Sequence, residues 1–164
     1  MTNSTPLVQA LASYGHYHRD RRNVATHAIG IPLIVLAVEI LLSRPVWALE
    51  YFTFTPAVIA SVAASIYYLK LDRMLGGALA LSLIVSARLG LEVAALGTGA
   101  WLTIGIGLFV VGWGFQFLGH HYEGRKPAFV DDLRSLLIGP LFVVAELAFA
   151  LGMRRDLKDA IHQR

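Results

Sequence analysis

The sequence predicts an all-α fold, a multi-pass membrane helical bundle with about four spans and a fifth membrane-associated or re-entrant helix. The first observation is composition: 56% of the residues are hydrophobic and 15% are charged, against about 45–50% and about 25% in a typical soluble domain. The second is that the apolar residues gather in long runs, as a bilayer crossing of about 20 helical residues requires. The third is the length of 164 residues, which fits one domain over residues 1–164. A soluble all-α bundle with unusually apolar helices is the alternative.

Five apolar segments make up the predicted bundle, and the polar residues 1–23 precede them, with a helix expected from Pro6 onward. The segments are residues 28–42, 56–69, 75–96, 100–118 and 136–151. The second is short for a full crossing, which takes about 17–25 residues. The last is interrupted by Gly139 and Pro140, and a proline inside a helix weakens it as a straight span. We therefore expect the last segment to be re-entrant or to lie at the membrane surface.

The positions of Lys and Arg set the expected orientation, because loops rich in these residues stay on the cytoplasmic side. If the last segment spans, eight basic residues lie on the side of the N-terminus and five on the other. If it is re-entrant, twelve lie on the N-terminal side and Arg44 alone on the other. The second arrangement predicts an integral membrane protein, in contact with the lipid bilayer, with both termini cytoplasmic. The net charge of +3 belongs to these loops, and no nucleic-acid partner is expected.

Four charged residues fall inside the predicted spans. Arg88 and Glu92 are four apart, so they share a helix face. Charges inside a span are costly and pair with one another or face a cavity, which makes these two either a structural pair or a substrate-binding pair. Glu39 and Glu146 are either neutral hydrogen-bond donors between helices or ligands in a polar cavity.

Five of the six histidines fall in two places along the chain. His16, His18 and His27 precede or open the first span, and His120 and His121 close the fourth. After four crossings the chain is back on the side where it began. The two groups can therefore meet at the cytoplasmic interface.

His18 and His27 cannot bind one ion from a single straight helix. They are nine residues apart, which places them on opposite faces and about 13 Å apart along the axis. A break between them is required. The sequence predicts this break at residues 20–23, with Asn23 as the N-cap of a helix that begins at Val24.

The second histidine group offers a different pair of candidate ligands. His120 and Glu123 are three residues apart and share a face if this segment is helical, as in the Glu-x-x-His pairs of carboxylate metal proteins. The chain has no cysteine, so a metal would be held by His, carboxylate or water. These ligands suit Fe(II), Zn or Mn.

Three blocks of the sequence carry a family resemblance. In chain order they are Tyr14-x-x-x-His18 with Asn23, His27 and Gly30-x-Pro32; Gln116-Phe117-Leu118-Gly119-His120 with Glu123-Gly124-Arg125-Lys126-Pro127-Ala128-Phe129 and Asp131-Asp132-Leu133; and Gly139-Pro140-Leu141-Phe142 with Glu146. With these blocks the chain resembles the Mpo1-like family from about Tyr14 to Leu157. Spaced blocks of this length are far more specific than a pair of histidines.

The resemblance implies an Fe(II)-dependent dioxygenase that uses O₂ to shorten a 2-hydroxy fatty acid by one carbon, the reaction called α-oxidation. It implies Fe(II) as the cofactor, with His18, His27 and His120 as ligands. Glu123 would be a further ligand or the partner of a ligating imidazole. His121 is the alternative to His120 as the ligand of the second group.

Two more positions are expected near the substrate under this resemblance. Asn23 would contact the substrate or support a ligand, unless it serves only as an N-cap. Arg125, or Lys126 beside it, would attract the substrate carboxylate, unless these residues serve only the charge asymmetry of the loops.

Two other functions stay open from the residues alone. A membrane zinc hydrolase would use zinc to activate water. A small metal-binding transporter or scaffold would have no chemistry, and Arg88 and Glu92 inside a span are the feature on which that interpretation depends.

Overall fold

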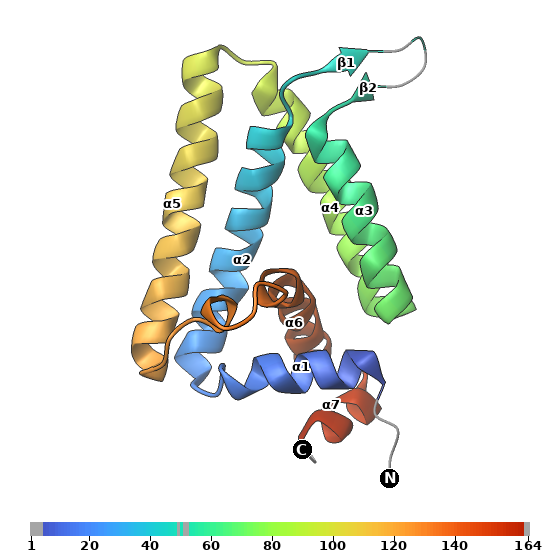
Figure 1. Ribbon diagram of the computed structural model, residues 1–164, viewed down its shortest axis with the longest axis vertical. Helices are drawn as coiled ribbons and strands as arrows, with labels where there is room; N and C mark the ends of the chain where they lie inside the picture. Colours follow the sequence, from blue (N-terminus) through green and yellow to red (C-terminus); the bar gives the residue numbers. More distant parts are fainter. Residues whose placement is uncertain (1–4, 49, 51–52, 163–164) are drawn as a thin grey trace.

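The computed structural model describes residues 5–48, 50 and 53–162, and Figure 1 shows their arrangement. The helices are α1 (Pro6–His16), α2 (Arg21–Leu42), α3 (Pro56–Leu71), α4 (Arg73–Ala94), α5 (Thr98–Glu123), α6 (Ser135–Ala150) and α7 (Arg155–His162), with a 3-10 turn η1 (Ala128–Val130) before α6. A two-residue antiparallel pair, β1 (Trp47–Ala48) with β2 (Thr53–Phe54), joins α2 to α3. The predicted all-helical class is confirmed.

Four helices form a row in the order α5, α2, α4, α3, from left to right in Figure 1. Successive helices of the row, followed along the chain, run in opposite directions, so the beginning of α2 and the end of α5 lie at the same end. At that end α6 packs against α2 and α4, while α1 and α7 pack on each other and on the bundle. We call this end, which holds α1, α6 and α7, the site end.

The largest buried apolar cluster lies at the site end around α6. Leu141 and Phe142 of α6 pack with Leu11 of α1 and with Leu79 of α4, and all four side chains are buried. The cluster therefore joins the N-terminal helix, the row and α6 into one body, and burial of large side chains is what holds such elements together.

Among the described residues, three helices, α2, α4 and α5, are long and apolar enough to cross a membrane, and the count reaches four if α6 and α7, bent by 119°, form one broken span. α3, predicted as a span, is a shorter apolar helix of 16 residues. α6 runs unbroken through Pro140, so the predicted interruption there is wrong. Proline removes one helical hydrogen bond, but the packing of α6 in the core keeps it continuous.

The contact between α2 and α5 is made by glycines. Gly105, Gly112 and Gly119 are seven residues apart on α5 and all are buried, a spacing that keeps them on one seam between two coiled helices. A Cβ added at Gly112 would lie 2.9 Å from the Gly30 carbonyl oxygen of α2, and one added at Gly30 would lie 2.7 Å from that of Gly112. The two backbones are therefore in direct contact.

Arg44 holds the opposite end of the row together. Its guanidinium donates to the carbonyls of Ala94 and Leu96, at 2.6 Å each, and to the Thr98 hydroxyl at 3.0 Å. The carbonyls at the end of α4 have no helical partner, and Arg44 supplies one. The same guanidinium lies 4.7 Å from the centre of the Trp101 ring on α5.

Asp72 and Arg154 tie the turn between α3 and α4 to the connection between α6 and α7. Asp72 accepts from the Leu75 amide at 2.8 Å, which caps α4, and from the Arg154 guanidinium at 2.7 Å. Burial raises the pKa of Asp72, but these hydrogen bonds outweigh it and the pKa is lowered overall. A carboxylate that is stabilised in this way keeps both elements at the site end.

The charged residues inside the helices take structural positions. Arg88 and Glu92 form an ion pair on the outer face of α4, where the side chains are 70% and 59% exposed. Glu39 is buried and accepts a hydrogen bond from Ser61 of α3 at 2.7 Å, so the contact is interhelical as expected, but Glu39 is the acceptor in it and not the predicted donor. Neither pair lies at the site end.

The glycine seam yields a stability prediction. Replacing Gly112 by Ala puts a methyl group 2.7 Å from Ile34 and against the Gly30 carbonyl, and overpacking of this kind costs about 1–3 kcal/mol. Gly107→Ala is the matched control, since its Cβ meets nothing within 4 Å. We expect thermal unfolding of the detergent-solubilised protein to show a lower Tm for Gly112→Ala and an unchanged or higher Tm for Gly107→Ala. Equal Tm values for the two variants would contradict the seam.

Candidate metal centre

Three histidines meet at the site end. His18 and His27 approach with their Nε2 atoms 3.1 Å apart, and the His120 ring centre lies 5.2 Å from that of His18 and 4.9 Å from that of His27. All three are buried, and one nitrogen atom of each lies within 4.8 Å of the others. The group has the shape of a site that could hold a metal ion.

The link between α1 and α2 brings His18 into this group. α1 ends at His16 and α2 begins at Arg21, so the break lies at residues 17–20, earlier than the predicted 20–23. The predicted cap is also wrong: Asp20 is the N-cap, and its carboxylate accepts from the Arg22 amide at 2.8 Å. Asn23 is thereby free to serve inside the first turn of α2.

Backbone carbonyls fix the orientation of two imidazoles. His18 Nδ1 lies 2.7 Å from the Tyr14 carbonyl oxygen and His27 Nδ1 lies 3.0 Å from that of Asn23. A carbonyl only accepts, so each Nδ1 carries the hydrogen and each Nε2 presents a lone pair. Burial lowers the pKa of His18 to about 4, which keeps its ring neutral at physiological pH.

Two lone pairs that face each other at 3.1 Å repel, and a cation held between them removes the repulsion. Two nitrogen ligands at right angles on a metal with bonds of about 2.1 Å stand about 3.0 Å apart, close to the observed separation. His120 contributes a buried Nδ1 that has no hydrogen-bond partner. The residues therefore fit a metal ion bound by three imidazoles.

Aromatic rings from α1 and α6 hold His18 in place. The Tyr14 ring stacks on the His18 ring with centres 4.1 Å apart and planes 8° apart. Phe142 of α6 lies 5.0 Å from Tyr14 and 5.7 Å from His18, centre to centre. These contacts fix the plane of a ring that no helix carries.

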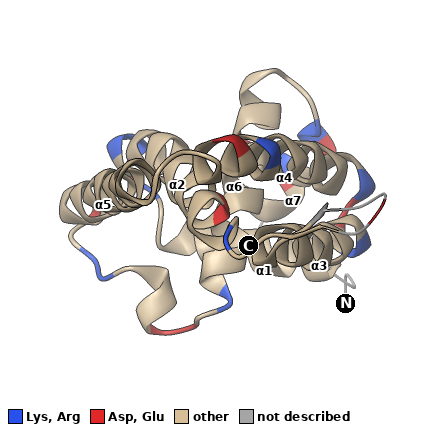
Figure 2. Cartoon of the chain, turned by 90° about the horizontal axis from the view of Figure 1, so that it is seen from above, with Lys and Arg blue, Asp and Glu red and all other residues tan. Residues whose placement is uncertain are grey.

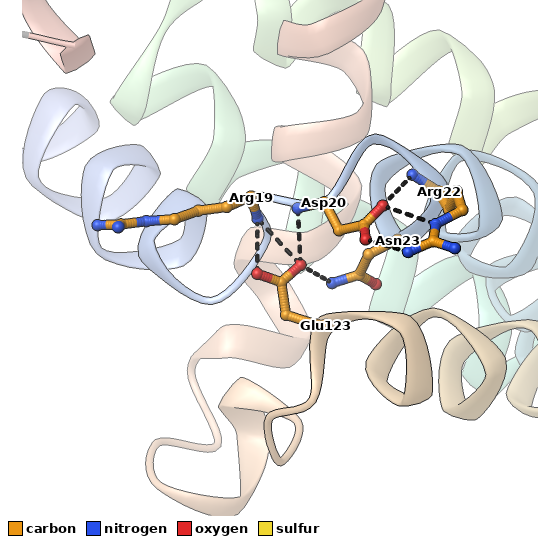
Figure 3. A network of polar contacts seen from close by, with 5 residues as sticks. All are labelled: Arg19, Asp20, Arg22, Asn23 and Glu123. Carbon is orange, nitrogen blue, oxygen red and sulfur yellow. Dashed lines mark hydrogen bonds and ion pairs between the residues drawn. The ribbon is translucent and has the colours of Figure 1, made fainter.

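Glu123 lies outside the group of three imidazoles and secures the link instead (Figure 3). Its carboxylate accepts from the backbone amides of Arg19 at 3.1 Å and Asp20 at 2.9 Å, and from Asn23 Nδ2 at 3.0 Å. Asn23 in turn offers its carbonyl to His27. Glu123 thus holds the backbone of the link that joins two of the imidazoles, and its role as a ligand or as the partner of a ligating imidazole stays a prediction.

Of the other predicted site residues, one lies beside the three imidazoles and the others lie away from them. Asn23 is fully buried beside the cluster, and its Oδ1 has no hydrogen-bond partner. His121 is exposed, so of these two adjacent histidines it is His120 that belongs to the group of three imidazoles. Arg125 is exposed and donates to the His16 carbonyl at 3.3 Å. Lys126 pairs with Asp131.

Two hollows flank the imidazoles. The inner cavity, of about 80 Å³, lies between α1, α2, α5, η1 and α6. Its lining combines apolar side chains with the polar side chains of His27, His120, Gln116, Trp113, Tyr14 and Ser135. The outer groove, of about 1120 Å³, lies between α1, α2, α6 and α7 and includes His18 and Glu146 in its lining.

The residues that sequence reasoning overlooked are Trp113 and the amide of Gln116. A helical face signal existed for both, because Trp113, Gln116 and His120 are spaced three and four residues apart, which stacks them on one face of α5.

Comparison with known proteins gives the family. The family described as "2-hydroxy-palmitic acid dioxygenase Mpo1-like" matches residues 4–151, which include all three histidines. The chain belongs to the Mpo1-like family. A relative from Saccharomyces cerevisiae, named "2-hydroxy-palmitic acid dioxygenase MPO1", is 34% identical over 162 residues, covering 94% of this Mpo1-like chain and 87% of the relative. No solved structure matches the chain significantly.

The Glu123 network yields a prediction about the link. Glu123→Ala removes a charged acceptor worth about 1.5–3 kcal/mol, so we expect hydrogen exchange at the Arg19 and Asp20 amides to become at least about tenfold faster. Glu92→Ala on the exposed face of α4 is the control and should leave these amides unchanged. Unaltered exchange in Glu123→Ala would show that the link is held by other contacts.

Proposed function

We propose that this protein is an Fe(II)-dependent dioxygenase of 2-hydroxy fatty acids, in which His18, His27 and His120 hold the metal. The observation that carries the proposal is the pair of facing imidazole nitrogens, 3.1 Å apart, with a third imidazole beside them. The name of the yeast relative supports the substrate class. The whole chain, residues 1–164, would act as one membrane-embedded domain.

The proposed reaction is the shortening of the acid by one carbon. One 2-hydroxy fatty acid and one O₂ give the acid one carbon shorter, CO₂ and water, which balances all atoms. When bound, the metal would supply open coordination positions that bring the hydroxy acid and O₂ together. The chain itself holds the imidazoles neutral, orients two of them through the Tyr14 and Asn23 carbonyls, and fixes the link through Glu123.

We propose that the bundle spans a membrane with the site end on the cytoplasmic side. The outer faces of α3, α4 and α5 expose large apolar side chains, including Ile59, Leu81, Ile84 and Val110, and exposed apolar surface on this scale marks a membrane or protein interface. Figure 2 supports this, since most of the helical surface carries no Lys, Arg, Asp or Glu. A membrane enzyme meets its fatty acid in the bilayer where the acid resides.

A zinc hydrolase is the second candidate, and one observation favours it. The three imidazoles have no carboxylate among them in the described part of the chain, and three histidines hold zinc in known water-activating sites, whereas a common iron oxygenase site has two histidines and one carboxylate. The transporter alternative receives no such support, because Arg88 and Glu92 face outward from α4.

Oxygen consumption tests the proposed function. We expect the purified, detergent-solubilised protein to consume O₂ when given 2-hydroxyhexadecanoic acid and Fe(II), and to release the acid that is one carbon shorter. Hexadecanoic acid without the hydroxyl is the control and should support no uptake. Tightly bound zinc with no O₂ uptake would replace the dioxygenase by the hydrolase.

Adjacent histidines provide a matched test of the metal site. His120→Ala removes one of the three buried imidazoles, whereas His121→Ala alters an exposed one. We expect His120→Ala to lose nearly all bound metal and O₂ consumption, and His121→Ala to keep both near wild-type values, as measured by elemental analysis and oxygen electrode. The reverse pattern would assign the ligand role to His121.

A further inference from the structure

Two residues that line the inner cavity carry a buried N–H donor without an acceptor. Gln116 is 6% exposed and its Nε2 has no hydrogen-bond partner, and the same holds for the buried Nε1 of Trp113. Both side chains line the inner cavity together with His27 and His120. Buried donors in proteins are almost always paired, so two unpaired donors in one cavity point to a ligand that accepts hydrogen bonds.

The fold makes room for the Gln116 amide at a specific place. A Cβ added at Gly30 would clash with its Nε2, so the absence of a side chain at Gly30 leaves room for the amide. Gln116 is one helical turn from His120, and Trp113 is one further turn along the same face. The two donors and the imidazole are therefore aligned along α5 beside the cavity.

The size and lining of the cavity indicate the ligand. About 80 Å³ holds only a few heavy atoms, since one water takes about 30 Å³ in the liquid. The remaining wall includes Ile31, Val35 and Leu136, and Leu136 is half exposed at the mouth. A small group that accepts hydrogen bonds and is joined to an apolar chain fits the carboxylate of a fatty acid.

We propose that Gln116 and Trp113 bind the carboxylate of the 2-hydroxy fatty acid, with its head in the inner cavity beside His27 and His120 and its acyl chain leaving past Leu136. This inference rests on the proposed function, since it assigns the same substrate to a particular side of the three imidazoles. It makes Gln116 and Trp113 substrate-binding residues that set the preference for a free acid.

The outer groove is the competing place for the head group. Arg19 and Arg21 line it, but so does Glu146, and only His18 of the three imidazoles borders it. In the inner cavity, two imidazoles and two unpaired donors converge. The structure therefore favours the inner cavity, and an Arg21→Gln variant tests the alternative directly.

The test measures equilibrium binding of 2-hydroxyhexadecanoic acid and of its methyl ester to the metal-loaded protein, without O₂, by calorimetry. Gln116→Met keeps the side-chain length, and Trp113→Phe keeps a ring against Phe129, 5.1 Å away, so each removes little besides the donor. We expect each variant to bind the acid about tenfold or more weakly, to lose preference for acid over ester by the same factor, and to keep its metal content and Tm. Trp47→Phe, an exposed indole on β1, is the control and should bind as wild type does.

Several results would overturn the inference while the proposed function stands. One such result is a wild-type protein that binds and turns over the acid while both variants keep the wild-type affinity for it. Another is an equal loss of affinity for acid and ester in the variants, which indicates a merely structural role. A loss of acid preference in Arg21→Gln alone would move the head group to the outer groove. A wild-type protein that neither binds the acid nor consumes O₂ would instead defeat the proposed function itself.

Discussion

The direct contact between the backbones of α2 and α5 is the constraint on which the candidate site depends. Gly30 meets Gly112 without an intervening side chain, and Gly119 lies against Asn23 and Thr26 at the site end. A glycine seam fixes both the distance between two helices and their rotation about their axes, because no flexible side chain can absorb a change. His27 and His120 are carried on those two helices, so their separation is set by backbone packing.

The third imidazole is held by a different principle. His18 lies on a short link between two helices, where it is held by the Tyr14 carbonyl, a stacked ring and the Glu123 carboxylate. The partly buried Glu123 carboxylate accepts from several N–H groups and so gives the backbone of the link its hydrogen-bond partners. The polar groups around the imidazoles are thus paired with one another, except for those that face the inner cavity and Asn23 Oδ1.

The apolar runs and the distribution of Lys and Arg are sufficient to predict a helical bundle in which the first span begins on the side where the fourth span ends. The structure brings His18, His27 and His120 together at that end. The break before α2 could be predicted because two histidines nine residues apart cannot share one straight helix. Its position could not, since Asp20 and Asn23 are both good caps and only the tertiary contact of Asn23 with Glu123 separates them. The interruption predicted at Pro140 is absent from α6, because tertiary packing of that helix overrides the local effect of the proline. The inner cavity could not be predicted, because it depends on which faces of α5 and α6 oppose each other. Helical periodicity shows which residues share a face of one helix, but not which helix packs against that face.

The position of His18 outside any helix has a kinetic consequence. Two of the three imidazoles cannot separate without parting α2 from α5, a change on the scale of global unfolding. The link at residues 17–20 can detach by a local opening, which requires far less free energy than unfolding the bundle. Loading and release of a metal ion at this site would therefore be gated by fluctuation of these four residues, so that a metal held there would exchange while the protein remains folded.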